Sequence, residues 1–317
     1  MDNNEPIMVS IKCLVYNHAP YLRQCLDGFV MQKTNFRFEA IVHDDCSTDG
    51  SQEIIKEYAA KYPDIIKPIY ETENQYSKHD GSLRRAIDPH LTGKYIAFCE
   101  GDDYWIDPNK LQMQVDYMEE HSDCGLTYSK VYTVNENSEK LGTFGEACTF
   151  DSLINYNRIP TATVCFRRKL YQAYIQEISI SPQWLMGDLP IWLYCAYKSD
   201  LFFFDSHTAC YKILQNSASG RSSHKLREDF SNSNIDICIF FAKHFQRYDK
   251  IKLIHKKHIN SLLNLSMEYN EKPYTNIFHL FHKYKIYSPL LILKYIILRS
   301  SFGRNLYKYA STMKNKK

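Results

Sequence analysis

The sequence lacks two features that would define common protein classes: paired cysteine motifs and long apolar runs. Its ten cysteines are scattered between Cys13 and Cys238, with no Cys-x-x-Cys pair. This spacing argues against a zinc site and a disulfide framework, and it favours a reducing cytoplasm. No uncharged apolar run reaches the roughly 18 residues of a membrane span. The acidic segment 1–6 does not resemble a signal peptide, so we expect a cytoplasmic protein without a transmembrane helix.

Acidic residues are scarce in the last quarter of the chain. Residues 243–317 hold 16 Lys and Arg against 3 Asp and Glu, whereas the rest of the chain holds 23 against 33. A basic tail on an acidic body predicts an anionic partner, either a membrane or a nucleic acid. The tail contains no Gly-rich or zinc-type recognition motif, so we expect no nucleic-acid partner.

The first 120 residues alternate between strand and helix patterns. The expected strands cover residues 9–16, 38–42, 65–70 and 95–99. Helical spacing covers residues 21–31 and the segment after Gly50, and Asp107-Pro108 predicts a third helix with Asp107 as its N-cap. Such alternation predicts an α/β fold with a mostly parallel sheet and flanking helices. We predict a nucleotide-binding catalytic domain over residues 1–220 and a basic helical region over residues 221–317.

Polar residues follow three of the four expected strands. They are Tyr16-Asn17, Asp44-Asp45 and Glu100-Gly101-Asp102-Asp103. Ligands of parallel sheets bind beyond the carboxyl ends of the strands. Carboxylates gathered there repel each other unless a cation or hydrogen-bond donors offset the charge, and Mg²⁺ prefers such oxygen ligands. Each cluster also fits a plain turn with helix-capping acids.

Three motifs in order resemble the family-2 glycosyltransferases over roughly residues 7–220. They are the strand ending in Tyr16-Asn17, the run from His43 to Ser51 that contains Asp44-Asp45, and the segment from Gly93 to Trp105 that contains Asp102-Asp103. The resemblance implies a GT-A (Rossmann-like) fold, an inverting mechanism and a role in building bacterial surface polysaccharide. It also implies a nucleotide-sugar donor, by default a UDP-sugar, a glycan or lipid-linked acceptor, and Mg²⁺ or Mn²⁺ as cofactor.

The same resemblance assigns roles to individual residues. Tyr16 and Asn17 would line the nucleotide pocket, and Asp45 would bind the base. Arg84 would lie near the donor, with the adjacent Arg85 as the alternative for that position. Asp102 would hold ribose or metal, and Asp103 would ligate the metal. Asp188 would be the catalytic base.

Two points remain open at this stage. Asp188 also fits an N-cap of the helix that follows it, and a cap position lowers the basicity of a carboxylate. Members of the family often carry a His where this chain reads Leu214-Gln215-Asn216, which puts a third protein ligand to the metal in doubt. The competing functions are a sugar nucleotidyltransferase, which normally has a Gly-rich phosphate loop where this chain reads Tyr16 to Pro20, and a non-catalytic membrane-associated binding protein on the same fold.

The segment 288–309 combines Leu and Ile with Lys294, Arg299, Arg304 and Lys308. It is too short and too charged to span a bilayer, but a basic helix of this kind can lie at a membrane surface. We therefore expect peripheral contact with an anionic membrane. The alternative is that the helix packs on the catalytic domain or on a second subunit as part of a homo-oligomer.

Overall fold

The structure is a computed structural model that describes residues 5–214 and 223–306. The predicted boundary at residue 220, Gln215-Asn216, Lys308 and Tyr309 lie outside the described residues. The described residues form two compact units, and we describe each unit separately. The first contains residues 5–153, 157–182 and 191–214, and the second contains residues 154–156, 183–190 and 223–306.

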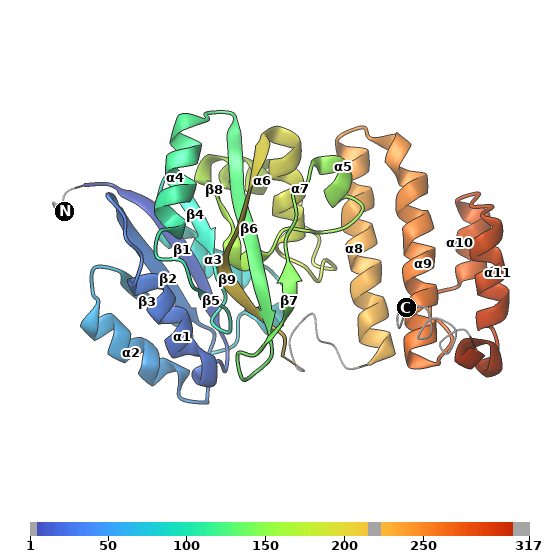
Figure 1. The fold of residues 1–317 in the computed structure, drawn as a ribbon, viewed down its shortest axis with the longest axis horizontal. Helices are drawn as coiled ribbons and strands as arrows, with labels where there is room; N and C mark the ends of the chain where they lie inside the picture. The colour runs from blue at the N-terminus through green and yellow to red at the C-terminus, as the bar shows by residue number, and fades with distance from the viewer. Residues whose placement is uncertain (1–4, 215–222, 307–317) are drawn as a thin grey trace. The chain divides into compact units, whose positions relative to one another are not determined.

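The first unit is built on a nine-stranded sheet (Figure 1). Its strands are β1 (Ile7–Val15), β2 (Arg37–Asp44), β3 (Ile66–Tyr70), β4 (Tyr95–Phe98), β5 (Tyr104–Trp105), β6 (Cys124–Val134), β7 (Lys140–Phe144), β8 (Cys165–Arg167) and β9 (Asp200–Lys212). Its helices are α1 (Ala19–Val30), α2 (Ser51–Lys61), α3 (Ser82–Ile87), α4 (Lys110–Glu120), α5 (Phe150–Leu153) and α6 (Arg168–Glu177), and α7 (Leu189–Lys198) begins within the second unit. The strand order is β3-β2-β1-β4-β8-β6-β9-β5, with β7 paired to β6.

The predicted α/β fold is confirmed, and the parallel arrangement holds for the N-terminal part of the sheet. Strands β3, β2, β1 and β4 are all parallel. Beyond β4 the sheet is mixed, because β8 runs antiparallel to both β4 and β6 while β9 runs parallel to β6. The four predicted strands agree with β1 to β4 to within two residues at each end.

Alternating apolar residues form the core between β1 and its flanking helices. Val9, Ile11, Cys13 and Val15 are at most 1% exposed. The helical pattern read over 21–31 places Leu22, Leu26 and Phe29 in the same core, as expected for one face of an amphipathic helix. Cys13, Cys99 and Cys195 are fully buried, and none of the ten cysteines forms a disulfide. These buried thiols pack as small apolar groups.

The prediction that Asp107 caps a helix is wrong. Helix α4 begins at Lys110, and its N-cap residue is Asn109. The Asp107 carboxylate instead accepts a hydrogen bond from the Asn109 amide over 2.9 Å. Asp107 therefore stabilises the turn that precedes the helix, a competing role that Asp side chains take as readily as capping.

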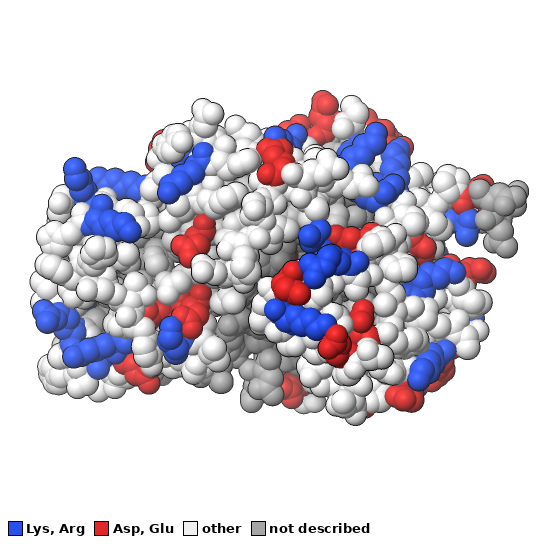
Figure 2. Space-filling view, turned by 180° about the vertical axis from the view of Figure 1, so that it is seen from behind, with Lys and Arg blue, Asp and Glu red and all other residues white. Residues whose placement is uncertain are grey.

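The second unit consists mainly of helices: α8 (His224–His244), α9 (Ile251–Tyr269), α10 (Ile277–Lys283) and α11 (Pro289–Leu298). Helices α8 and α9 lie side by side (Figure 1). A small apolar core joins α9, α10 and α11, with Leu262, Phe281 and Leu298 among its members. On the face drawn in Figure 2, this helical unit carries several patches of Lys and Arg separated by uncharged surface and a few acidic side chains. No helix in the two described ranges is long and apolar enough to cross a membrane.

The sequence suggests one helix over the segment 288–309, but the structure divides this segment. Helix α11 ends at Leu298, and residues 301–306 form a separate helical segment. Arg304 donates a hydrogen bond to the Leu298 carbonyl over 2.9 Å, which satisfies one of the carbonyls left unpaired at the end of a helix. A Cβ at Gly303 would lie 1.9 Å from the Ile297 carbonyl oxygen, so only glycine allows this tight reversal.

Candidate active site

The three polar clusters lie side by side at the carboxyl ends of β1, β2 and β4. Val15 at the end of β1 pairs with Asp44 at the end of β2. The Asp45 amide donates to the Val15 carbonyl over 2.9 Å, and the Gly101 amide donates to the Leu14 carbonyl over 2.9 Å. The structure therefore brings Tyr16, Asn17, Asp45, Asp102 and Asp103 to one edge of the sheet.

The loop after β1 and the loop after β2 are joined by side-chain hydrogen bonds. The Asn17 side-chain oxygen accepts from the Thr48 amide over 2.9 Å, and the Asn17 amide donates to the Ser47 hydroxyl over 2.9 Å. Asn17 has a φ of 56°, in the left-handed region that Asn tolerates better than most residues. The hydrogen bonds and this backbone conformation fix the turn that carries Tyr16, whose side chain is half exposed.

Asp49 connects the N-termini of two helices, a role that the sequence did not reveal. One carboxylate oxygen accepts from the Ala19 amide at the start of α1 over 2.8 Å. The other accepts from the Ser51 amide over 3.0 Å and from the Ser51 hydroxyl over 2.7 Å at the start of α2. The His18 amide donates in turn to the Ser51 hydroxyl. Much of the run Ser47-Thr48-Asp49-Gly50-Ser51 therefore serves to hold the two loops together.

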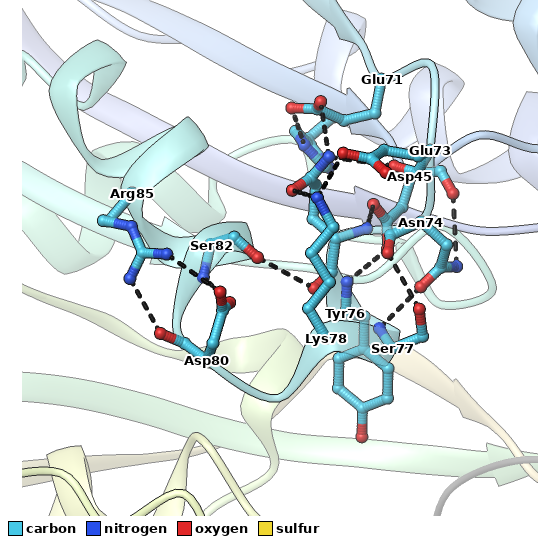
Figure 3. Close-up of polar contacts among 12 residues, drawn as sticks. Asp45, Glu71, Glu73, Asn74, Tyr76, Ser77, Lys78, Asp80, Ser82 and Arg85 are labelled. Atoms are coloured by element: carbon cyan, nitrogen blue, oxygen red, sulfur yellow. Dashed lines mark hydrogen bonds and ion pairs between the residues drawn. The ribbon is translucent and has the colours of Figure 1, made fainter.

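Asp45 holds a second loop in place (Figure 3). It is buried, and its two carboxylate oxygens accept hydrogen bonds from the Gln75 amide over 2.6 Å and the Tyr76 amide over 2.9 Å. Its carbonyl oxygen also accepts from the Asn74 side chain. Each carboxylate oxygen keeps a second lone pair, so Asp45 retains the capacity to accept a further N–H or O–H.

Asp103 and Asp102 lie in different environments although they are adjacent in the chain. Asp103 is 3% exposed, and it accepts a hydrogen bond from the Lys212 amide over 2.8 Å. Burial, followed by the neighbouring charge of Asp102, raises the pKa of Asp103 well above its usual range. One oxygen of Asp102 is also buried, and no side chain or backbone group in the described residues donates a hydrogen bond to it.

Lys212 is a site residue that sequence reasoning missed. It is 1% exposed, and its ammonium group donates to the Ser138 hydroxyl over 3.0 Å and lies 4.9 Å from the ring centre of Tyr21. Burial lowers its pKa, whereas the nearby charges of Asp103 and Asp102 raise it in part. The available signal was a single Lys within the apolar strand end Ala209 to Leu214, because a buried Lys needs a specific reason to be there.

Comparison with known proteins identifies the family of this chain. Residues 10–175, more than half of the chain, match the family model described as "Glycosyl transferase family 2". The chain belongs to that family.

Relatives of this family-2 chain include proteins from several bacteria. An uncharacterized protein of Mycobacterium tuberculosis is 38% identical over 168 residues, which cover 51% of this chain and 47% of that protein. The match thus spans about half the length of that protein. The putative teichuronic acid biosynthesis glycosyltransferase TuaG of Bacillus subtilis is 28% identical over 225 residues, covering 69% of this chain and 84% of TuaG.

Solved structures share the fold with this family-2 chain. The Staphylococcus aureus TarS fragment 1–349 in complex with UDP-GlcNAc has a TM-score of 0.55 and 17% identity, covering 96% of this chain and 89% of that fragment. The mannosyltransferase PcManGT of Pyrobaculum calidifontis, in complex with GDP-Man and Mn²⁺, has a TM-score of 0.53 and 14% identity, covering 97% and 88%. At these identities the likeness shows the fold alone.

Arg84 and Arg85 have different partners. The Arg84 guanidinium lies 3.6 Å from the Asp88 carboxylate and is about one-third exposed, whereas Arg85 is more exposed and bonds to the carbonyl and side chain of Asp80 (Figure 3). Asp88 also accepts from the Tyr171 hydroxyl. Arg84 is therefore the more firmly held of the two, and its role near the donor stays a prediction.

Asp188 belongs to the second unit and is described apart from the residues above. Its carboxylate accepts a hydrogen bond from the amide of Leu189, the first residue of α7, over 2.7 Å. In the same segment, the Leu185 amide donates to the Ser233 hydroxyl of α8. This bond joins Asp188 to the first amide of α7, whereas an N-cap side chain accepts from the second or third amide of a helix. The assignment of Asp188 as catalytic base stays a prediction.

The carboxylates at the end of β4 fit a divalent cation that takes its remaining ligands from a phosphate group of another molecule. In residues 5–214 and 223–306, no group of three or more His, Cys, Asp and Glu side chains is arranged to hold a metal. Mg²⁺ commonly binds through one or two carboxylates together with substrate phosphates. The buried Asp102 oxygen without a donor is the kind of atom that a cation would satisfy.

Proposed function

We propose that this chain is an inverting, metal-dependent glycosyltransferase. It transfers a sugar from a nucleotide-diphosphate sugar, by default a UDP-sugar, to a hydroxyl group of a glycan or lipid-linked acceptor in polysaccharide synthesis. The observation that carries the proposal is the convergence of Asp45, Asp102 and Asp103 at one sheet edge, in a chain of this family. The name of TuaG supports a role in polysaccharide synthesis, and the UDP-GlcNAc and GDP-Man complexes of the structural neighbours support a nucleotide-sugar donor.

The nucleoside part of the donor would be held by the loops after β1 and β2. The half-exposed ring of Tyr16 offers a surface on which a base can stack, with Asn17 fixing the turn below it. Asp45 would accept an N–H of the base or a ribose hydroxyl with its free lone pairs. Because Asp45 already orders residues 74–76, the same carboxylate links donor binding to the conformation of that loop.

The diphosphate would lie next to Asp102, Asp103 and Lys212. The two carboxylates would hold Mg²⁺ or Mn²⁺, which supplies Lewis-acid stabilisation of the charge that develops on the leaving diphosphate. Lys212 places a buried positive charge beside both carboxylates, which lowers the electrostatic cost of gathering them there. Asp188 would take the proton of the attacking hydroxyl, a contribution that is typically worth ~10²–10⁴-fold in rate.

A screen of nucleotide-sugar hydrolysis tests the proposal without a known acceptor. The full chain is incubated with a panel of UDP-, GDP- and dTDP-sugars in the presence of Mg²⁺, Mn²⁺ or EDTA, and release of nucleoside diphosphate is measured. We expect slow release from at least one donor, with loss of release in EDTA and in Asp102→Ala. Asp116→Asn, an exposed change on α4, is the matched control and should behave like the parent. Absence of both hydrolysis and nucleotide binding across the panel would contradict the proposal.

A further inference from the structure

We propose that the exposed side of α11 docks on an anionic lipid surface. We call this side the α11 outer face and define it by Leu290, Leu293 and Ile296, which are 76%, 55% and 60% exposed. They are spaced three residues apart and so lie along one side of the helix. This inference does not depend on the proposed transferase activity.

The other side of α11 is occupied by contacts with its own unit. Leu291 and Leu298 are buried in the small core formed with α9 and α10. The Lys294 ammonium group donates to the side chains of Asn260 and Asn264 on α9, over 3.1 and 2.5 Å. The helix is therefore fixed in its rotation, and the outer face is not available for packing within this unit.

Exposed apolar side chains also flank α11 in the chain. Tyr287, just before the helix, is 67% exposed, and Phe302 and Leu306 after it are 76% and 56% exposed. Large exposed apolar residues scattered singly are ordinary, but six of them within twenty residues form a concentration that needs an explanation. An amphipathic helix with aromatic flanks is typical of a segment that lies in a bilayer interface.

The charge of the sequence on both sides of α11 favours anionic lipid over other occupants of the outer face. From Lys272 to the C-terminus the sequence contains ten Lys and Arg and no Asp or Glu. Lys283, Lys285 and Arg299 are exposed, and no carboxylate in the described residues pairs with them. The three acidic residues between Lys243 and the C-terminus pair with Arg247, Arg227 and His224 instead.

A second copy of this chain fits the face less well. Two identical basic surfaces would meet across a symmetric interface without acidic residues to offset their repulsion. A nucleic acid would meet the positive charge, but it offers no apolar surface for Leu290, Leu293 and Ile296. An anionic bilayer satisfies both requirements, since its headgroups attract the basic residues and its acyl boundary accepts the apolar ones.

Vesicle binding by point variants tests the inference. Removing the whole segment from Ser288 would also remove Leu291 and Leu298 from the core, so substitutions on the outer face are the sharper test. The full chain and the triple variant Leu290→Ser/Leu293→Ser/Ile296→Ser are sedimented with vesicles of phosphatidylcholine, with and without phosphatidylglycerol. We expect the parent to bind only the anionic vesicles, less at high salt, and the triple variant to bind at least ~10-fold more weakly.

Three controls make the result decisive. Leu141→Ser changes a Leu of similar exposure (58%) on β7 and should leave vesicle binding intact. Lys283→Gln/Lys285→Gln/Arg299→Gln changes only charge and should weaken binding to anionic vesicles, which keeps the test valid if the apolar triple variant is less stable. Donor hydrolysis should be unchanged in both triple variants, so a failure of the membrane inference can be distinguished from a failure of the transferase proposal. Two results would overturn the inference. One is that both triple variants bind vesicles as well as the parent does. The other is that the parent forms a dimer and binds no vesicles, and that the apolar triple variant dissociates this dimer.

Discussion

The backbone amide of Lys212 donates a hydrogen bond to the Asp103 carboxylate over 2.8 Å, which joins the end of β9 to the loop after β4. These residues are 109 positions apart in the sequence. The contact places the buried Lys212 side chain beside a pair of carboxylates, where its charge acts on both. Because the backbone makes the contact, the side chain of Lys212 can be changed without breaking it.

Substitution of Lys212 is predicted to weaken nucleotide binding without destabilising the fold. Met fills a similar volume, and the burial of the ammonium group offsets part of its attraction to the carboxylates, so Lys212→Met should leave the melting temperature within a few degrees. Affinity for UDP in the presence of Mn²⁺ should fall by ~10-fold because a fixed positive charge is lost near the diphosphate. Lys110→Met is the matched control, since Lys110 is a buried lysine of the same unit bonded to Gln114. Equal nucleotide affinity in parent and Lys212→Met would remove Lys212 from the site.

Asp45→Asn is predicted to reduce stability as well as nucleotide affinity. An Asn side chain has one oxygen and one NH₂ group, so it can accept from only one of the Gln75 and Tyr76 amides and presents a donor to the other. Leaving a buried donor unpaired costs about 1–3 kcal/mol. Urea unfolding should show a loss of this size, while Asp80→Asn, an exposed position in the same segment, should not. Unchanged stability would mean that Asp45 does not order the loop at residues 74–76.

Asp188→Asn is predicted to affect turnover and little else. Asn can still accept the hydrogen bond from the Leu189 amide, so the melting temperature should stay within a few degrees of the parent. It cannot take up a proton at neutral pH, so transfer should fall by ~10²-fold or more with near-normal donor and metal affinity. If Asp188 only caps α7, both stability and transfer survive. Transfer within about threefold of the parent would rule out the base assignment.

The helical unit is predicted to lose stability at acidic pH because the unfolded chain takes up a proton at His255 that the folded state does not. Burial lowers the pKa of His255 from 6.5 to about 4, with the charges of Lys283 and Lys243 acting in the same direction. The folded state therefore keeps His255 neutral, while the unfolded chain takes up a proton below pH 6.5, so its contribution is complete above that pH and is lost as the pH falls towards 4. From pH 7 to pH 5 this amounts to about 2 kcal/mol.

His255→Phe provides the measurement. It removes the titrating group and keeps an aromatic ring against Tyr284, on which His255 stacks. Urea unfolding at pH 7 and pH 5 should show a smaller loss in the variant than in the parent, by about 2 kcal/mol. His279→Phe, at an exposed position of α10, should lose as much as the parent. An equal pH loss in all three proteins would show that His255 does not titrate as described.

The sequence predicts the first half of the sheet well because its strands are short apolar runs, and β1 and β2 are each followed by a helix with a clear apolar face. It predicts the second half poorly because β6 and β9 pair in parallel although they lie far apart in the chain, and no local pattern encodes that register. The acidic clusters were found because they follow apolar strands directly. The hydrogen bonds of Asp45 and the bridging role of Asp49 could not be read from the sequence, since Asp serves equally as ligand, cap and turn former.

The most direct test of the account is calorimetry of UDP binding to the parent and to Asp103→Asn, with Mn²⁺ present and absent. Asn can accept the same hydrogen bond from the Lys212 amide and removes a buried charge, so the fold should be retained with no loss of melting temperature. We predict that Mn²⁺ strengthens UDP binding to the parent and that this gain disappears in Asp103→Asn. A folded Asp103→Asn protein that binds UDP with the full Mn²⁺-dependent affinity of the parent would contradict the account.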